Sequence, residues 1–90
     1  MYSITKEGDL YYITRGDMCS AMYMELEGQI VVIQLDTPKD HKGKGYAREL
    51  LEELRDKSNR PIRVISTETA IGYYHKLNYT QITHNIFESP

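Results

Sequence analysis

A glycine-bearing loop between an apolar run and an amphipathic helix constrains this chain more than any other feature. The apolar run covers residues 29–35 and is typical of a buried strand. After the loop, leucines and Ala47 recur at helical spacing, with charged residues on the opposite face. The loop reads His41-Lys42-Gly43-Lys44-Gly45-Tyr46-Ala47. Glycines let the backbone approach a ligand, and the first N–H groups of a helix attract negative charge. The sequence therefore predicts a site for a phosphate-bearing ligand, with Lys42 and Lys44 adding charge.

The spacing of the loop excludes two common phosphate-binding motifs. The P-loop requires a Gly-Lys followed by Ser or Thr, and no Gly-Lys in this chain has that neighbour. The dinucleotide fingerprint requires three glycines, and Gly43-x-Gly45 lacks the third.

Residues 42–47 instead resemble the acyl-CoA pyrophosphate loop of the GNAT acetyltransferase family, whose pattern is [Q/R]-x-x-G-x-[G/A] before a Leu-Leu helix. Lys42 takes the Gln/Arg position, Gly45 and Ala47 take the small positions, and Leu50-Leu51 follow. The pattern is of moderate specificity, because Gly-Lys-Gly also occurs in ordinary turns.

A second block strengthens the resemblance. Residues 70–79, Ala-Ile-Gly-Tyr-Tyr-His-Lys-Leu-Asn-Tyr, are similar to the late A-x-x-F-Y-E-K-L-G-F segment of the family. Asn78 replaces a glycine there, and Asn is the usual second choice where a helix stops with positive φ. The two blocks cover roughly the second half of the chain.

Hydrophobic patterning predicts six strands and two helices in one domain covering residues 1–90. The helices are expected at residues 45–57 and from 66 or 67 to about 77; the strands are expected at residues 2–5, 10–14, 19–27, 29–35, 61–66 and 79–87. We expect an α+β fold: a GNAT-like, mixed and mostly antiparallel sheet of about six strands. The turn Glu7-Gly8-Asp9 leaves no room for the helices that the family usually carries between its first two strands.

Charge and composition narrow the function classes. The net charge of −2 argues against a general nucleic-acid binder, although basic residues concentrate around the loop. The single cysteine, Cys19, is compatible with a reducing compartment, and it is expected to fill a strand rather than act as a nucleophile. No apolar run approaches membrane-spanning length, and the histidines show no metal spacing. We expect a cytoplasmic protein with no metal and no membrane partner.

The resemblance implies acetyl-CoA as cofactor. Its pantetheine arm would pair with backbone of the fourth strand at Ile33, Gln34 and Leu35. Its pyrophosphate would lie on N–H groups of the loop residues His41, Lys42, Gly43, Lys44, Gly45, Tyr46 and Ala47.

Tyr74 matches the position of the usual acid of the family, beside the cofactor, although its helical spacing also fits simple core packing. Four residues are candidates for the general base: Glu25, Glu27, Asp36 and His75. Of these, we expect Glu27 to act as the catalytic residue together with Tyr74.

The resemblance thus implies an N-acetyltransferase acting on an exposed amine, with a protein lysine or N-terminus as acceptor. Very compact members include viral proteins that modify host factors, and the length of 90 residues is compatible with such a role. The alternative is a non-catalytic GNAT-fold protein that binds or inhibits by protein–protein contact. An exposed Tyr/Met strand face is also compatible with a homodimer.

Overall fold

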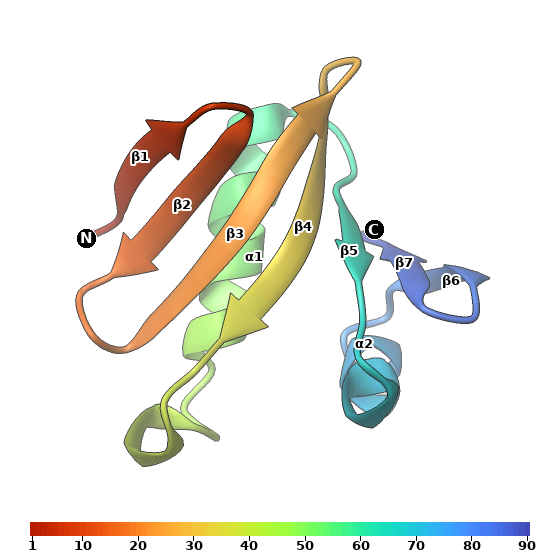
Figure 1. The fold of residues 1–90 in the computed structure, drawn as a ribbon. Helices are drawn as coiled ribbons and strands as arrows, with labels where there is room; N and C mark the ends of the chain where they lie inside the picture. The colour runs from red at the N-terminus through yellow and green to blue at the C-terminus, as the bar shows by residue number, and fades with distance from the viewer.

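The computed structural model describes all residues, 1–90, as one mixed sheet with two α-helices and two short 3₁₀ turns (Figure 1). The seven strands lie in the order β1-β2-β3-β4-β5-β7-β6, and only β4 and β5 are parallel. The helices are α1 (Tyr46–Ser58) and α2 (Ile71–Lys76), and the 3₁₀ turns are η1 (Lys39–His41) and η2 (Glu68–Ala70). The strands are β1 (Ser3–Glu7), β2 (Leu10–Arg15), β3 (Cys19–Leu26), β4 (Gln29–Asp36), β5 (Arg63–Ile65), β6 (Thr80–Thr83) and β7 (Ile86–Glu88).

The predicted α+β architecture is confirmed, including the absence of helices between β1 and β2. These two strands form a tight hairpin in which Glu7 pairs with Leu10, and Gly8 supplies the positive φ of the turn (62°). The helix stop expected at Asn78 is also present, with φ of 63°.

The single strand expected at residues 79–87 is two strands in the structure. The segment 79–87 forms a hairpin, β6 and β7, because His84 and Asn85 make a turn between them. The Gln81 side chain donates a hydrogen bond to the His84 carbonyl at 3.1 Å and closes that turn. Asn is a common turn residue, but no glycine or proline stands beside Asn85 to mark the turn in the sequence. The second expected helix likewise begins with η2, so the α-helical part starts at Ile71.

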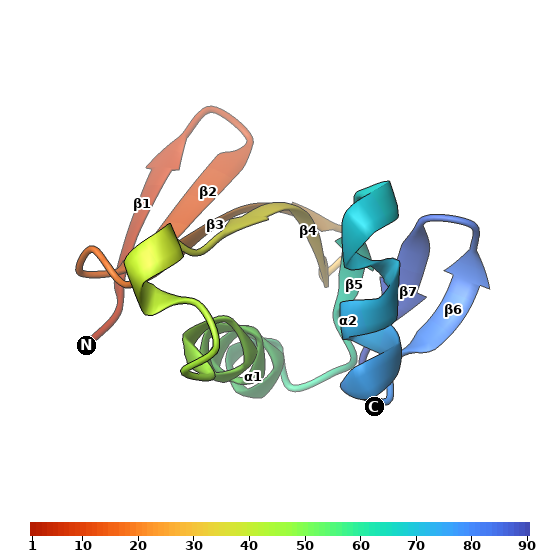
Figure 2. The ribbon, with the colours of Figure 1, turned by 90° about the horizontal axis from the view of Figure 1, so that it is seen from below.

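Both helices lie on the same concave side of the curved sheet (Figure 2). Leu50, Leu51 and Leu54 of α1 share one hydrophobic core with the inward residues of the strands and with Tyr74 of α2. Because both helices lie on this side, the other face of the sheet is left without a helix (Figure 2). Both helices fall short of the length and apolar character that a membrane crossing demands.

Candidate active site

The two glycines of the loop after β4 adopt backbone conformations that favour glycine. Gly43 and Gly45 adopt φ of 80° and 81°, a conformation that side chains with a Cβ rarely adopt. A Cβ at either position would meet nothing within 4 Å. Backbone conformation, not crowding, therefore requires these glycines, and the space beside them is open to a ligand.

The first turn of α1 has no side-chain cap. The first intrahelical hydrogen bond runs from the Glu49 N–H to the Gly45 carbonyl at 3.0 Å, so the N–H groups before Glu49 have no helical acceptor. Together with the helix dipole, these groups make the start of α1 a place that favours negative charge.

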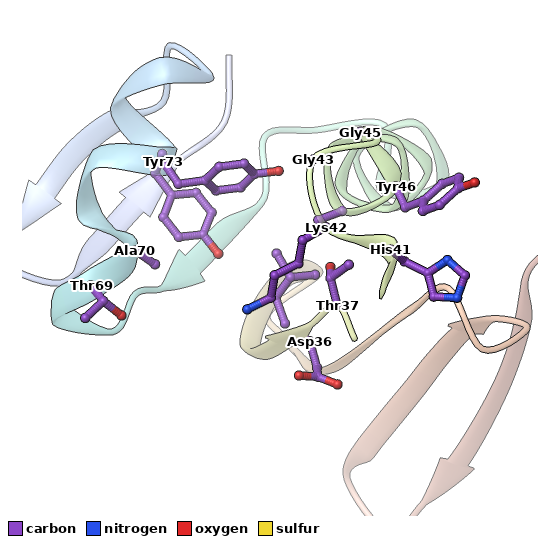
Figure 3. Close-up of a pocket in the computed structure, with 13 residues that line it drawn as sticks. Asp36, Thr37, His41, Lys42, Gly43, Gly45, Tyr46, Thr69, Ala70 and Tyr73 are labelled. Carbon is purple, nitrogen blue, oxygen red and sulfur yellow. The ribbon is translucent and has the colours of Figure 1, made fainter. Parts of the chain in front are cut away.

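A pocket of about 430 Å³ opens beside this helix start. Its walls come from the end of β4, the loop, the first residues of α1 and the η2–α2 segment (Figure 3). The lining residues are Leu35, Asp36, Thr37, His41, Lys42, Gly43, Gly45, Tyr46, Ala47, Thr69, Ala70, Tyr73 and Tyr74. Figure 3 shows the Lys42 side chain extending from the loop toward the side that carries Thr69 and Ala70.

The pocket lies where β4 and β5 separate. The two strands pair only at Val31–Arg63 and Val32–Val64, whereas β4 continues to Asp36. Directly after Val32, Ile33 has no partner on β3, because Val32 pairs with Tyr23 and Gln34 pairs with Met22. A bulge of this kind bends its strand. The far part of β4 therefore has no strand partner on its β5 side.

Tyr74 joins the pocket to the core. Its side chain is 4% exposed and its ring stacks on Phe87, with 5.5 Å between ring centroids. Burial, with a smaller contribution from Tyr73, raises the pKa of the Tyr74 phenol to about 12. The pKa of Tyr73 is raised too, chiefly by burial. The phenols of Tyr73 and Tyr74 are therefore protonated at neutral pH.

A cluster of contacts holds Tyr46, the first residue of α1. The Arg15 guanidinium lies over its ring, 5.1 Å from the centroid, and forms an ion pair with Glu49 one turn further along α1. The His41 ring packs edge-on against Tyr46 at 5.9 Å. The Cys19 thiol donates to the Tyr46 carbonyl at 3.5 Å, and burial raises the pKa of this thiol. A buried, protonated Cys19 agrees with a structural role and not a nucleophilic one.

The structure brings most of the expected binding residues together, but not all of them. Leu35, His41, Lys42, Gly43, Gly45, Tyr46, Ala47 and Tyr74 line the pocket; Ile33, Gln34 and Lys44 do not. Four lining residues were not predicted from the sequence: Thr37, Thr69, Ala70 and Tyr73. Ala70 and Tyr73 belong to the family-like segment 70–79, so that segment carried a signal for them.

Glu27, the expected catalytic partner of Tyr74, lies elsewhere. It is an exposed residue in the β3–β4 turn, with φ of 52°, whereas the pocket lies beyond the other end of β4. Its carbonyl accepts a hydrogen bond from Arg60 at 3.4 Å. Asp36 is the one acidic residue that lines the pocket. No three His, Cys, Asp or Glu side chains are grouped in a way that could hold a metal ion.

Solved structures match this arrangement of strands, loop and helices over almost the whole chain. Tetrahymena GCN5 aligns with a TM-score of 0.73 at 14% identity, covering 92% of this chain and 69% of that one. The Bacillus subtilis N-acetyltransferase YlbP, solved in complex with coenzyme A, aligns at 0.72 with 16% identity, covering 91% and 68%. The chain has the GNAT fold.

A third GNAT-fold match is the ribosomal-protein-S18-alanine N-acetyltransferase of Escherichia coli. It aligns with a TM-score of 0.67 at 17% identity, covering 94% of this chain and 71% of that one. No family model matches the sequence, and no curated protein matches it. At these identities the likeness to solved structures shows the fold alone.

Proposed function

We propose that this GNAT-fold chain is an N-acetyltransferase that transfers acetyl from acetyl-CoA to an exposed amine, with a protein lysine or N-terminus as acceptor. One arrangement carries the proposal: a single pocket is lined by the glycine loop, by the uncapped start of α1 and by the buried phenol of Tyr74. The coenzyme A bound to the GNAT-fold protein YlbP supports the choice of cofactor.

The residues of the pocket fit the pyrophosphate and pantetheine parts of coenzyme A in their chemistry. The pocket volume of about 430 Å³ falls within the usual range for small-molecule sites. The pyrophosphate would lie on the N–H groups at the start of α1, with Lys42 adding positive charge. The pantetheine arm would pair with the part of β4 that has no partner on the β5 side.

The acetyl thioester would supply an activated carbonyl. The acceptor ammonium, with a pKa of about 10.4, would first lose one proton to solvent. The neutral amine would then attack this carbonyl, so that a C–N bond forms, the C–S bond breaks and the electron pair leaves with sulfur. The nitrogen would lose its second proton to solvent as the amide forms.

Tyr74 would act on the leaving sulfur by donating a hydrogen bond. A thiol has a pKa of about 8.5, so complete proton transfer from a phenol with a pKa of about 12 is unfavourable. The phenol stabilises the developing thiolate, and the sulfur takes its proton from solvent afterwards. Such a donor, aimed at charge that develops in the transition state, is worth about 10²-fold in rate.

Thermal unfolding with acetyl-CoA tests the cofactor. Ligand at 100 times its Kd stabilises a fold by about 2.7 kcal/mol, or roughly 10–20 °C in Tm for a domain of this size. We expect this shift with acetyl-CoA, but not with ATP or free pantetheine at the same concentration. An unchanged Tm at millimolar acetyl-CoA would contradict the proposal.

Tyr74→Phe separates catalysis from binding. We expect kcat to fall about 10²-fold while the thermal shift by acetyl-CoA survives, because the ring remains and only the donor is lost. Tyr79→Phe is the matched control, since Tyr79 is a partly buried tyrosine that does not line the pocket. Acetyl-CoA binding with no transfer to any amine in the wild type would instead support a non-catalytic binding protein.

A further inference from the structure

A second pocket lies on the side of the sheet that has no helix. It has a volume of about 260 Å³ and is formed by β2, β3 and the end of β4. Its size is below that of typical drug-sized sites, so it suits one extended side chain or a short alkyl ligand.

The strand register arranges this pocket in two rows. Thr14, Ser20 and Asp36 face one another across β2, β3 and β4, and they offer two hydroxyls and a carboxylate. The neighbouring row is Tyr12, Met22 and Gln34. A polar row beside a row with a phenol ring and a thioether matches a ligand with a cationic head and an apolar stem.

Asp36 lines both pockets. Figure 3 shows its carboxylate at the edge of the first pocket, pointing away from Tyr73. It is the one charged side chain among the residues that line the second pocket, so no cation there competes for it. A group held by this carboxylate therefore lies at the boundary between the two pockets.

We infer that the second pocket is the acceptor site and that it binds a primary alkylammonium, with Asp36 as the counter-ion of the ammonium. The inference rests on the proposed function, because it takes the first pocket as the acetyl-CoA site. The ammonium group would lie on the row of Thr14, Ser20 and Asp36, and its methylenes would lie against Met22 and Tyr12. Bound in this way, the nitrogen reaches the end of β4 from the side opposite the helices.

The position of the second pocket favours an amine on a large molecule. Figures 1 and 2 show α1 and α2 on the other side of the sheet, so nothing in the chain covers β2 and β3 over this pocket. A lysine side chain on a protein surface can therefore enter without displacing any element. A free alkylamine offers the same chemistry, and the experiment compares the two sources.

The test is NMR titration of the isotope-labelled chain without acetyl-CoA. The probes are n-butylamine, a capped peptide with one lysine, and the same peptide with norleucine in place of lysine. We expect both amines to shift the signals of Ser20, Gln34 and the Met22 methyl group, and the norleucine peptide to leave them unchanged. Tighter binding of the peptide than of n-butylamine would identify a protein lysine as the source.

Two variants and one control complete the test. Asp36→Asn should weaken amine binding at least tenfold, and Gln34→Lys should abolish it by placing a second ammonium in the pocket. Asp56→Asn makes the same charge change on the exposed face of α1 and should bind like the wild type. Asp36 and Gln34 are both exposed, so the variants are expected to fold.

Three results would overturn the inference: equal amine affinity in Asp36→Asn and wild type, shifts that map to another surface, or binding of the norleucine peptide. The proposed function fails separately. If acetyl-CoA leaves the Tm unchanged while the amines bind beside Asp36, the proposed acetyltransferase function is contradicted and the amine-binding site is supported. If acetyl-CoA binds but no amine does, only the inferred acceptor site is contradicted.

Discussion

Tyr23 is fully buried, yet its hydroxyl makes no hydrogen bond. Its ring stacks on Tyr11 at 5.1 Å between centroids, so the aromatic part is well packed. A hydroxyl moved from water into a core without a partner costs about 1–3 kcal/mol in mutational data. The ring of Tyr23 therefore stabilises the sheet while its hydroxyl opposes folding.

We accordingly expect Tyr23→Phe to raise the free energy of unfolding by about 1 kcal/mol, because the ring contacts remain and the unpaired hydroxyl is removed. Chemical denaturation of the two proteins measures the difference. Tyr11→Phe is the control, since Tyr11 is less buried and its hydroxyl is not an unpaired buried group. A loss of stability in Tyr23→Phe would mean that the hydroxyl has a partner in solution.

At the scale of elements, the loop and α1 act as one unit. Gly45 caps the helix with φ of 81°, while Arg15 on β2 and Cys19 on β3 tie the first turn of the helix to the sheet. The N–H groups before Glu49 are therefore held in a fixed position although no side chain caps them. A rigid helix start of this kind is ready to bind an anion without further ordering.

Gly45→Ala tests this unit. We expect a loss of about 1–2 kcal/mol in the free energy of unfolding, since a left-handed conformation costs an alanine that much and no neighbour crowds the new methyl group. The thermal shift by acetyl-CoA should also shrink. Gly72→Ala in α2 is the control: this glycine has no positive φ and a Cβ there meets nothing within 4 Å, so the variant should be as stable as the wild type or more so. Equal effects of the two substitutions would contradict the role of the Gly45 conformation.

At the scale of the whole molecule, buried phenols link stability to alkaline pH. Burial raises the pKa of Tyr74 to about 12, and the pKa of Tyr79 is raised as well, chiefly by burial, from an unfolded value near 10. Above pH 10 the unfolded chain therefore loses phenol protons that the folded chain keeps. The stabilisation by the neutral phenols is fully present below pH 10 and is lost as pH rises toward 12.

We expect the free energy of unfolding to fall between pH 10 and 12, and to fall less steeply in Tyr74→Phe. Denaturant midpoints over this range measure both slopes. Lysines also titrate there, and the difference between wild type and variant removes their contribution. Parallel slopes for the two proteins would show that Tyr74 ionises near its ordinary pKa when folded.

The sequence determined the features that depend on near neighbours along the chain. Hydrophobic periodicity located α1 and most of the strands, and the residue type predicted the positive φ at Asn78, because backbone sterics act within a few residues. The loop and the segment 70–79 also resembled the GNAT family strongly enough to predict the fold. The turn at His84-Asn85 was missed because no glycine or proline marks it.

Only the tertiary structure decided which side chains meet. The bulge at Ile33 and the short β4–β5 pairing open the sheet, which brings Tyr73 and Tyr74 of α2 to the same pocket as the loop. The same chain path leaves Glu27 at the far end of β4 and sets Asp36 at the border of two pockets. Strand register and helix packing join residues far apart in sequence, and no local pattern encodes those distances.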